Sequence, residues 1–118
     1  MPSLKLKATL TGVGAVNNCY IYVERLPSPD YPYATPIGLD PKNSSRKEWS
    51  NPAISVEVYG NLDLQLNVHA FRGTGWTFKL YNKVGTKFVQ IFELEGETGS
   101  NPDHGRNVSI ERASIELN

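Results

Sequence analysis

The residue types that most often carry catalytic chemistry are sparse in this chain. It has one cysteine, Cys19, and two histidines, His69 and His104. His69 falls in a strand-like run and His104 in a polar, turn-rich segment, and no G-x-S-x-G nucleophile motif accompanies either. The parts of a Ser-His-Asp site occur in any protein, so they carry little weight alone. We therefore expect no enzymatic activity, and we interpret Cys19 as a small buried hydrophobic residue at a strand start.

Metal binding also has weak support in the sequence. One cysteine excludes a multi-cysteine zinc site, and the two histidines lack zinc-ligand spacing. Calcium is the more serious metal, because loops at the ends of a β-sandwich often supply oxygen ligands. Suitable side chains fall in three loops: Asn17 and Asn18; Asp30 and Asp40; Asn101 and Asp103. Such side chains more often bond locally to the backbone in turns. We therefore expect no cofactor and keep calcium as a weak alternative.

Polar side chains alternate along two stretches that could form a hairpin. If residues 62–70 and 76–82 pair with Ala70 opposite Trp76, their polar side chains line one outer face. That face would carry Gln65, Asn67 and His69 beside Thr77, Lys79 and Tyr81. Such a mixture of donors and acceptors, with an aromatic platform, is typical of sugar-binding sheet faces. The alternative is an ordinary solvated sheet face.

Two residues outside these strands are candidates for the same binding surface. Trp49 lies in a polar setting, where it is either a plug over one end of the core or an exposed stacking platform. Asp103 lies in a polar loop. The candidate ligand-binding set is therefore Gln65, Asn67, His69, Lys79, Tyr81, Trp49 and Asp103.

Composition narrows the class of protein. The 118 residues suit one domain, and the 12 basic and 12 acidic residues argue against a nucleic-acid binder that depends on overall charge. A lone cysteine excludes a disulfide-built scaffold. No apolar run has the length of a signal peptide or a membrane span. The default expectation is a cytoplasmic protein, although a mature secreted chain would look the same.

Period-two alternation of apolar and polar residues dominates the chain and predicts strands with one buried face. It predicts an all-β fold: an antiparallel β-sandwich, jelly-roll or Greek-key-like, of about seven to eight strands in a single domain over residues 1–118. In the last strand the apolar phase changes near Arg112, which predicts a β-bulge or a crossing between sheets. The predicted strands cover residues 4–10, 19–26, 54–58, 62–70, 76–82, 88–94 and 108–117.

Residues 27–53 differ from the rest, because six of the eight prolines lie there. Proline has no amide donor, so we expect a largely irregular segment in which short edge strands, or a helical turn over 44–49, could hide. A long loop of this kind in a compact domain is often functional.

Two turns follow from register. Pairing Leu80 with Phe88 leaves Lys83-Val84-Gly85 as a three-residue loop with glycine at its third position. A three-residue loop at Tyr59-Gly60-Asn61 would keep its flanking strands in phase; otherwise those two strands belong to different sheets.

The same register leaves two apolar residues, Val89 and Ile91, on an outer face. Such a patch needs a cover or a partner. The Pro-rich segment could cover it through Tyr31, Tyr33 or Ile37; the alternative is self-association through this sheet. The candidate interface is therefore Val89, Ile91, Tyr31 and Tyr33, and a homo-oligomer is the expected assembly if it is used.

The segments Leu4-Lys5-Leu6-Lys7-Ala8 and Asn18-Cys19-Tyr20-Ile21-Tyr22-Val23 resemble the start of a C2-type lipid-binding sandwich, over about the first fifth of the chain. The acidic calcium loops of that pattern are not apparent, so the resemblance is an architectural hint and assigns no family.

Three functions remain open on the sequence. The first is a non-catalytic binding module, with a carbohydrate as the expected ligand. The second is an interaction or structural protein that assembles through its apolar sheet face. The third and weakest is a calcium-dependent membrane-binding module.

Overall fold

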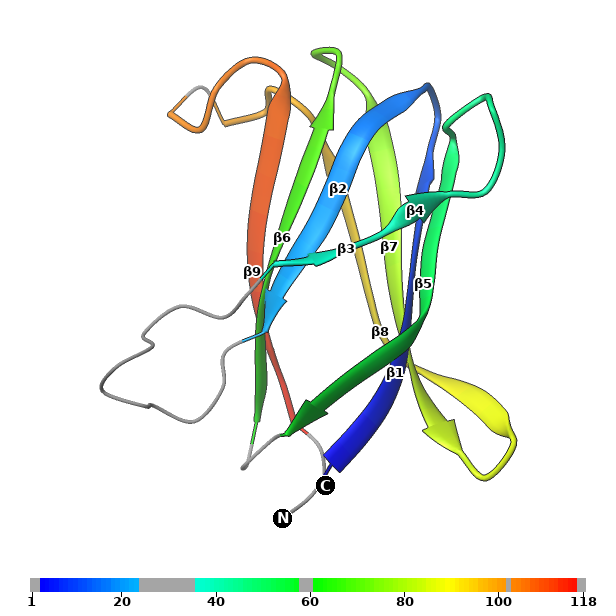
Figure 1. Cartoon of the computed structure of the whole chain (residues 1–118). Helices are drawn as coiled ribbons and strands as arrows, with labels where there is room; N and C mark the ends of the chain where they lie inside the picture. Colours follow the sequence, from blue (N-terminus) through cyan, green and yellow to red (C-terminus); the bar gives the residue numbers. More distant parts are fainter. Residues whose placement is uncertain (1–2, 24–35, 58–60, 102, 117–118) are drawn as a thin grey trace.

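The chain folds into two antiparallel sheets packed face to face. The computed structural model describes residues 3–23, 36–57, 61–101 and 103–116. One sheet has the order β4-β5-β1-β7-β8 and the other the order β3-β2-β6-β9, and Figure 1 shows them as two layers. This confirms the predicted β-sandwich, with nine strands over the described residues: β1 Ser3–Gly12, β2 Val16–Val23, β3 Ile37–Gly38, β4 Asp40–Pro41, β5 Glu48–Glu57, β6 Leu62–Ala70, β7 Gly75–Val84, β8 Lys87–Glu97 and β9 Val108–Ile115.

The core lies between the sheets and follows the period-two pattern. Alternate residues of each long strand point inward, because successive side chains of a strand point to opposite faces. The even positions of β6 from Leu62 to Ala70 are all buried, as are Trp76, Phe78 and Leu80 on β7. The alternation predicted for these strands is therefore confirmed.

The strand β5 begins earlier than the sequence pattern indicates. It starts at Glu48 and runs through Pro52, where residues 44–49 were considered for a helical turn. Leu6 pairs with Ile54 but Ala8 pairs with Asn51, so β5 has one extra residue beside Lys7. A bulge of this kind accommodates a proline, because the ladder is interrupted there. The expected short edge strands are present as β3 and β4.

The proposed pairing of residues 62–70 with 76–82 is wrong. β6 and β7 lie in different sheets, and residues 71–74 carry the chain from one layer to the other. A parity argument does not distinguish a hairpin from a crossing, because both arrangements turn the apolar sides of the two strands toward one core. The same holds for β5 and β6, which also lie in different sheets, as the alternative to the loop at 59–61 required.

β7 and β8 do form a hairpin, but with a different turn. Val84 pairs with Lys87, so the loop is the two residues Gly85 and Thr86 rather than Lys83-Val84-Gly85. Gly85 has a φ of 65°, as the first position of a type II′ hairpin turn requires.

A bulge in β8 shifts by one residue which side chains of this strand face the core. Leu80 pairs with Phe92 and Tyr81 pairs with Gln90, so Ile91 is the extra residue. The predicted outer patch of Val89 and Ile91 opposite Lys79 and Thr77 is therefore wrong. Ile91 packs against the core instead.

β9 has no phase change within its paired residues. It pairs with β6 continuously from His69↔Val108 to Leu62↔Ile115. Ser109 and Ile115 are buried on the inner side, so Val108 and Ile110 lie on the outer side. The predicted bulge near Arg112 is wrong, because a serine at an inner position and two apolar residues at outer positions imitate a phase change.

Candidate ligand-binding face

The outer side of the sheet β2-β6-β9 gathers polar and aromatic side chains in neighbouring rows. Tyr20 on β2 lies opposite Asn67 on β6, and Tyr22 lies opposite Gln65. Gln65 in turn lies opposite Arg112 on β9. We call this set, together with His69, the tyrosine–amide face.

A chain of hydrogen bonds runs across the tyrosine–amide face. Arg112 Nε donates to Gln65 Oε1 at 2.9 Å, and Gln65 Nε2 donates to Asn67 Oδ1 at 2.9 Å. Asn67 Nδ2 donates to the Tyr20 hydroxyl at 3.5 Å, which lies 3.2 Å from His69 Nε2. Since that hydroxyl oxygen accepts from Asn67, its own proton is available to His69 in the tautomer that carries hydrogen on Nδ1. Each polar group thereby fixes the orientation of the next.

The aromatic rings pack against one another on this face. Tyr20 and His69 stack with ring centroids 5.6 Å apart and planes 23° apart. Tyr20 and Tyr22 meet edge to face at 5.6 Å and 84°. The rings of Tyr20, Tyr22 and His69 are half-buried, whereas Asn67 is only 8% exposed. The face therefore has a buried amide at its centre and partly accessible rings around it.

The network leaves donors for a ligand. It uses only Nε of the Arg112 guanidinium and one N–H of each amide, Gln65 and Asn67. In the tautomer above it also leaves Nδ1–H of His69. These groups, next to the half-buried Tyr22 ring, can hold a neutral polyhydroxy compound or an acceptor such as a carboxylate.

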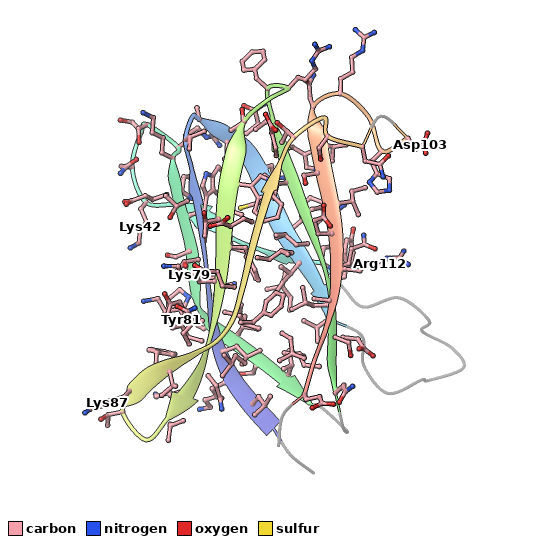
Figure 2. All side chains as sticks on the ribbon, turned by 180° about the vertical axis from the view of Figure 1, so that it is seen from behind. Lys42, Lys79, Tyr81, Lys87, Asp103 and Arg112 are labelled. Carbon is pink, nitrogen blue, oxygen red and sulfur yellow. The ribbon has the colours of Figure 1, made fainter. Side chains whose placement is uncertain are left out.

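The structure brings together only part of the predicted ligand set. Gln65, Asn67 and His69 lie on the tyrosine–amide face, but Lys79 and Tyr81 lie on the outer side of the other sheet. Figure 2 shows Lys79 and Tyr81 on one side of the molecule and Arg112 on the opposite side. There Lys79 Nζ lies 3.8 Å from Glu93, and Lys7 Nζ lies 5.7 Å from the Tyr81 ring centroid.

The sequence reasoning did not assign Tyr20, Tyr22 and Arg112 to the site. The signal for the two tyrosines was present, because they alternate with buried residues on β2. What was missing is that β2 and β9, and not β7, flank β6.

Trp49 and Asp103 do not join this face. Trp49 is 3% exposed, and its Nε1 donates to the Arg46 carbonyl at 2.9 Å, so it is the plug and not the stacking platform. Asp103 is exposed in the loop between β8 and β9. Figure 2 places it on the side of Arg112 but nearer one end of the sandwich.

The candidate interface residues are also separated by the structure. Val89 is 50% exposed near the tip of the β7–β8 hairpin, while Ile91 is half-buried against the core. Tyr31 and Tyr33 lie outside the described residues.

In the described part of the chain, no group of three or more His, Cys, Asp or Glu residues could hold a metal ion. Asn101 Oδ1 accepts a hydrogen bond from the Asp103 amide at 3.1 Å, as in a local turn. Asp30 lies outside the described residues. Burial raises the pKa of the Cys19 thiol to about 12, which keeps it protonated and unreactive at neutral pH.

No family model, curated protein or solved structure matches this chain. Within the described residues no helix is both long and apolar enough to cross a membrane.

Proposed function

We propose that this β-sandwich is a non-catalytic carbohydrate-binding module whose ligand lies on the tyrosine–amide face. The observation that carries the proposal is the hydrogen-bond chain from Arg112 through Gln65 and Asn67 to Tyr20 and His69. Neighbouring sugar hydroxyls both donate and accept, so they require groups held in fixed orientations. Side chains that already fix one another lose little conformational entropy when a ligand binds.

The aromatic part of the face supports the same ligand class. The half-buried Tyr22 ring is held edge-on against Tyr20 and lies beside the amide row. A sugar ring combines an apolar C–H side with a polar rim, and an amphipathic tyrosine beside amides complements both. The face has the few oriented polar groups on an apolar surround that small-molecule sites use.

A glycan array with matched variants tests the proposal. We expect the wild-type chain to bind a defined group of glycans, and we expect His69→Ala and Tyr22→Ala each to weaken binding by about tenfold or more, as the loss of one good contact predicts. Tyr81→Ala is the matched control, because it removes a half-buried tyrosine from the opposite sheet. Equal binding by wild type and both face variants would rule out the site, and no glycan binding at all would rule out the ligand class.

A second candidate function is assembly through the β7–β8 hairpin. Three apolar side chains near its tip are exposed: Val84 at 58%, Val89 at 50% and Phe88 at 38%. Figure 1 shows this hairpin extending beyond the body of the sandwich. Light scattering should then give a particle larger than a monomer, which Val89→Lys splits; a strict monomer at all concentrations contradicts assembly.

A further inference from the structure

Four loops meet at one end of the sandwich, at the top of Figure 1. They are residues 13–15, 42–47 and 71–74, together with the described residues 98–101 and 103–107, and we call them the loop end. Backbone hydrogen bonds connect the loops directly or through the strand ends beside them: Gly12 N, at the end of β1, to Lys47 O at 2.7 Å; Val13 N to Gly75 O, at the start of β7, at 2.9 Å; and Gly73 N to Thr98 O at 2.9 Å. The loop end is therefore one connected platform rather than four independent loops.

The middle of the loop end displays two apolar side chains. Val13 is 78% exposed and Phe71 is 77% exposed, more than any other large hydrophobic residue in the described ranges. Their loops are neighbours, since a Cβ on Gly14 would lie 3.9 Å from Thr74 Cγ2. Side chains held this far out of a core contribute nothing to folding by burial, so an apolar environment elsewhere would stabilise them.

Cations stand on both sides of this apolar pair. Arg46 and Lys47 lie exposed in the loop whose carbonyls accept from Val16 N and Gly12 N, and Arg72 and Arg106 lie exposed on the other side. One of the four is positioned by a contact with an aromatic ring: the Arg46 guanidinium lies 5.4 Å from the Trp49 ring centroid. The Arg72 side chain passes close to Gly99, since its Cγ would lie 2.8 Å from a Cβ there.

The charge of the loop end differs from that of the whole chain. The chain has 12 cationic and 12 acidic residues. Among the described residues of the four loops, the only carboxylate is Asp103, against these four cations and Lys42. Two exposed carboxylates directly flank these loops: Glu48, and Glu97, whose Oε1 would lie 3.7 Å from a Cβ on Gly73. With them included, the five cations outnumber three carboxylates, so the surroundings of the exposed apolar pair carry a positive excess.

We propose that the loop end docks onto an anionic lipid membrane without calcium, with Val13 and Phe71 entering the interface and the flanking cations contacting lipid phosphates. Interfacial binding depends on buried apolar area together with attraction to anionic lipids, and each surface cation adds to that attraction. Phosphate contacts alone would not explain the two protruding apolar side chains, and a hydrophobic protein partner would not explain the surrounding cations. The proposal is independent of the sugar-binding face, which lies on the outer side of one sheet.

Vesicle co-sedimentation in EDTA tests this proposal. We expect the wild-type chain to bind phosphatidylcholine vesicles containing phosphatidylserine, to bind pure phosphatidylcholine vesicles much less, and to dissociate as salt is raised. Phe71→Ser and Val13→Ser should each reduce binding, and Arg72→Ala and Arg106→Ala should each reduce it about fivefold. Val84→Ser is the matched control, because it removes an exposed valine from the β7–β8 hairpin at the other end.

The replaced side chains are exposed, so each variant should keep the thermal melting curve of the wild type. The Phe71 carbonyl, which accepts hydrogen bonds from the Thr74 and Thr98 hydroxyls, is unchanged by the substitution. Absence of vesicle binding in EDTA would overturn the proposal. So would binding that appears only with calcium, and so would equal binding by Phe71→Ser and wild type.

Discussion

At the scale of single residues, the packing of Trp76 depends on the absence of a side chain at Gly96. The two residues face each other across β7 and β8, and a Cβ on Gly96 would lie 2.7 Å from Trp76 Cε2. Gly96→Ala must therefore displace a ring that is only 3% exposed. We expect a loss of about 1–3 kcal/mol in the free energy of unfolding, measured in urea, as overpacking typically costs.

Gly38→Ala is the matched control for this prediction. Gly38 also lies in a strand, and a Cβ there meets nothing within 4 Å, so its effect should stay within about 0.5 kcal/mol. Equal losses for both variants would mean that the indole does not pack on Gly96.

The buried thiol of Cys19 makes stability depend on pH. Burial raises its pKa to about 12 in the folded chain, whereas an unfolded thiol ionises near its ordinary value of about 8.5. Between these values the folded state binds more protons than the unfolded state, so the free energy of unfolding falls as pH rises. The contribution of the protonated thiol to the free energy of unfolding is fully present below the ordinary pKa. It is lost as the pH rises toward the pKa of the thiol in the folded chain.

Urea unfolding at about pH 7 and about pH 10 measures this loss. We expect wild type to lose roughly 2 kcal/mol more than Cys19→Ala over that interval, since each pH unit above the ordinary pKa is worth about 1.4 kcal/mol. Comparing each protein with itself removes the cost of the cavity left by alanine. Parallel pH dependence in the two proteins would show that the thiol is not the group responsible.

At the scale of elements, the β7–β8 turn allows the cost of a positive φ to be measured separately from side-chain packing. Gly85 has a φ of 65°, and a Cβ there would meet nothing within 4 Å. Gly85→Ala should therefore cost about 1–2 kcal/mol through backbone conformation alone. Thr86→Ala, in the same turn but without a positive φ, should change the free energy of unfolding by less than about 0.5 kcal/mol. Chemical denaturation of both variants makes the comparison, and similar losses would contradict the turn assignment.

Local alternation was enough to predict which side of most strands is buried, because one core selects one face of each strand. Leu62 to Ala70 on β6 is the clearest case. The alternation did not predict the strand register at the two bulges, at Ile91 in β8 and beside Pro52 in β5. A bulge changes the phase by one residue, and nothing in the apolar pattern distinguishes it from a change of register.

Strand partners were the part that alternation could not supply. The predicted site placed Gln65, Asn67 and His69 correctly on one face of one strand, but paired that strand with β7. Pairing depends on which loops cross between layers, and the four residues 71–74 after β6 cross, although a loop of that length also suits a hairpin. Two of the seven predicted ligand-binding residues, Lys79 and Tyr81, were misplaced through this single error.

At the scale of the whole molecule, the sheet edges are protected against pairing with another chain. The edge strands β3 and β4 have two residues each. The edge strand β8 carries Glu93, Glu95 and Glu97, all exposed, and β9 carries an exposed Arg112 at the other open edge. Short or charged edges disfavour strand addition. We therefore expect assembly, if it occurs, to use another surface, such as the hairpin tip.

The tyrosine–amide face and the loop end should act independently, because they lie on different parts of the sandwich and share none of the side chains proposed to bind. We expect Tyr22→Ala to weaken glycan binding without changing vesicle binding, and Phe71→Ser to do the reverse. The double variant should lose both kinds of binding. Each loss should match that of the corresponding single variant within about 0.5 kcal/mol, because substitutions at distant sites normally act independently. His69 is the residue of the tyrosine–amide face that lies nearest to the loop end, since it ends the hydrogen-bond chain close to the loop that begins at Phe71. If glycan saturation changes vesicle affinity in the wild-type chain, the two surfaces are coupled and the independence expected here is wrong.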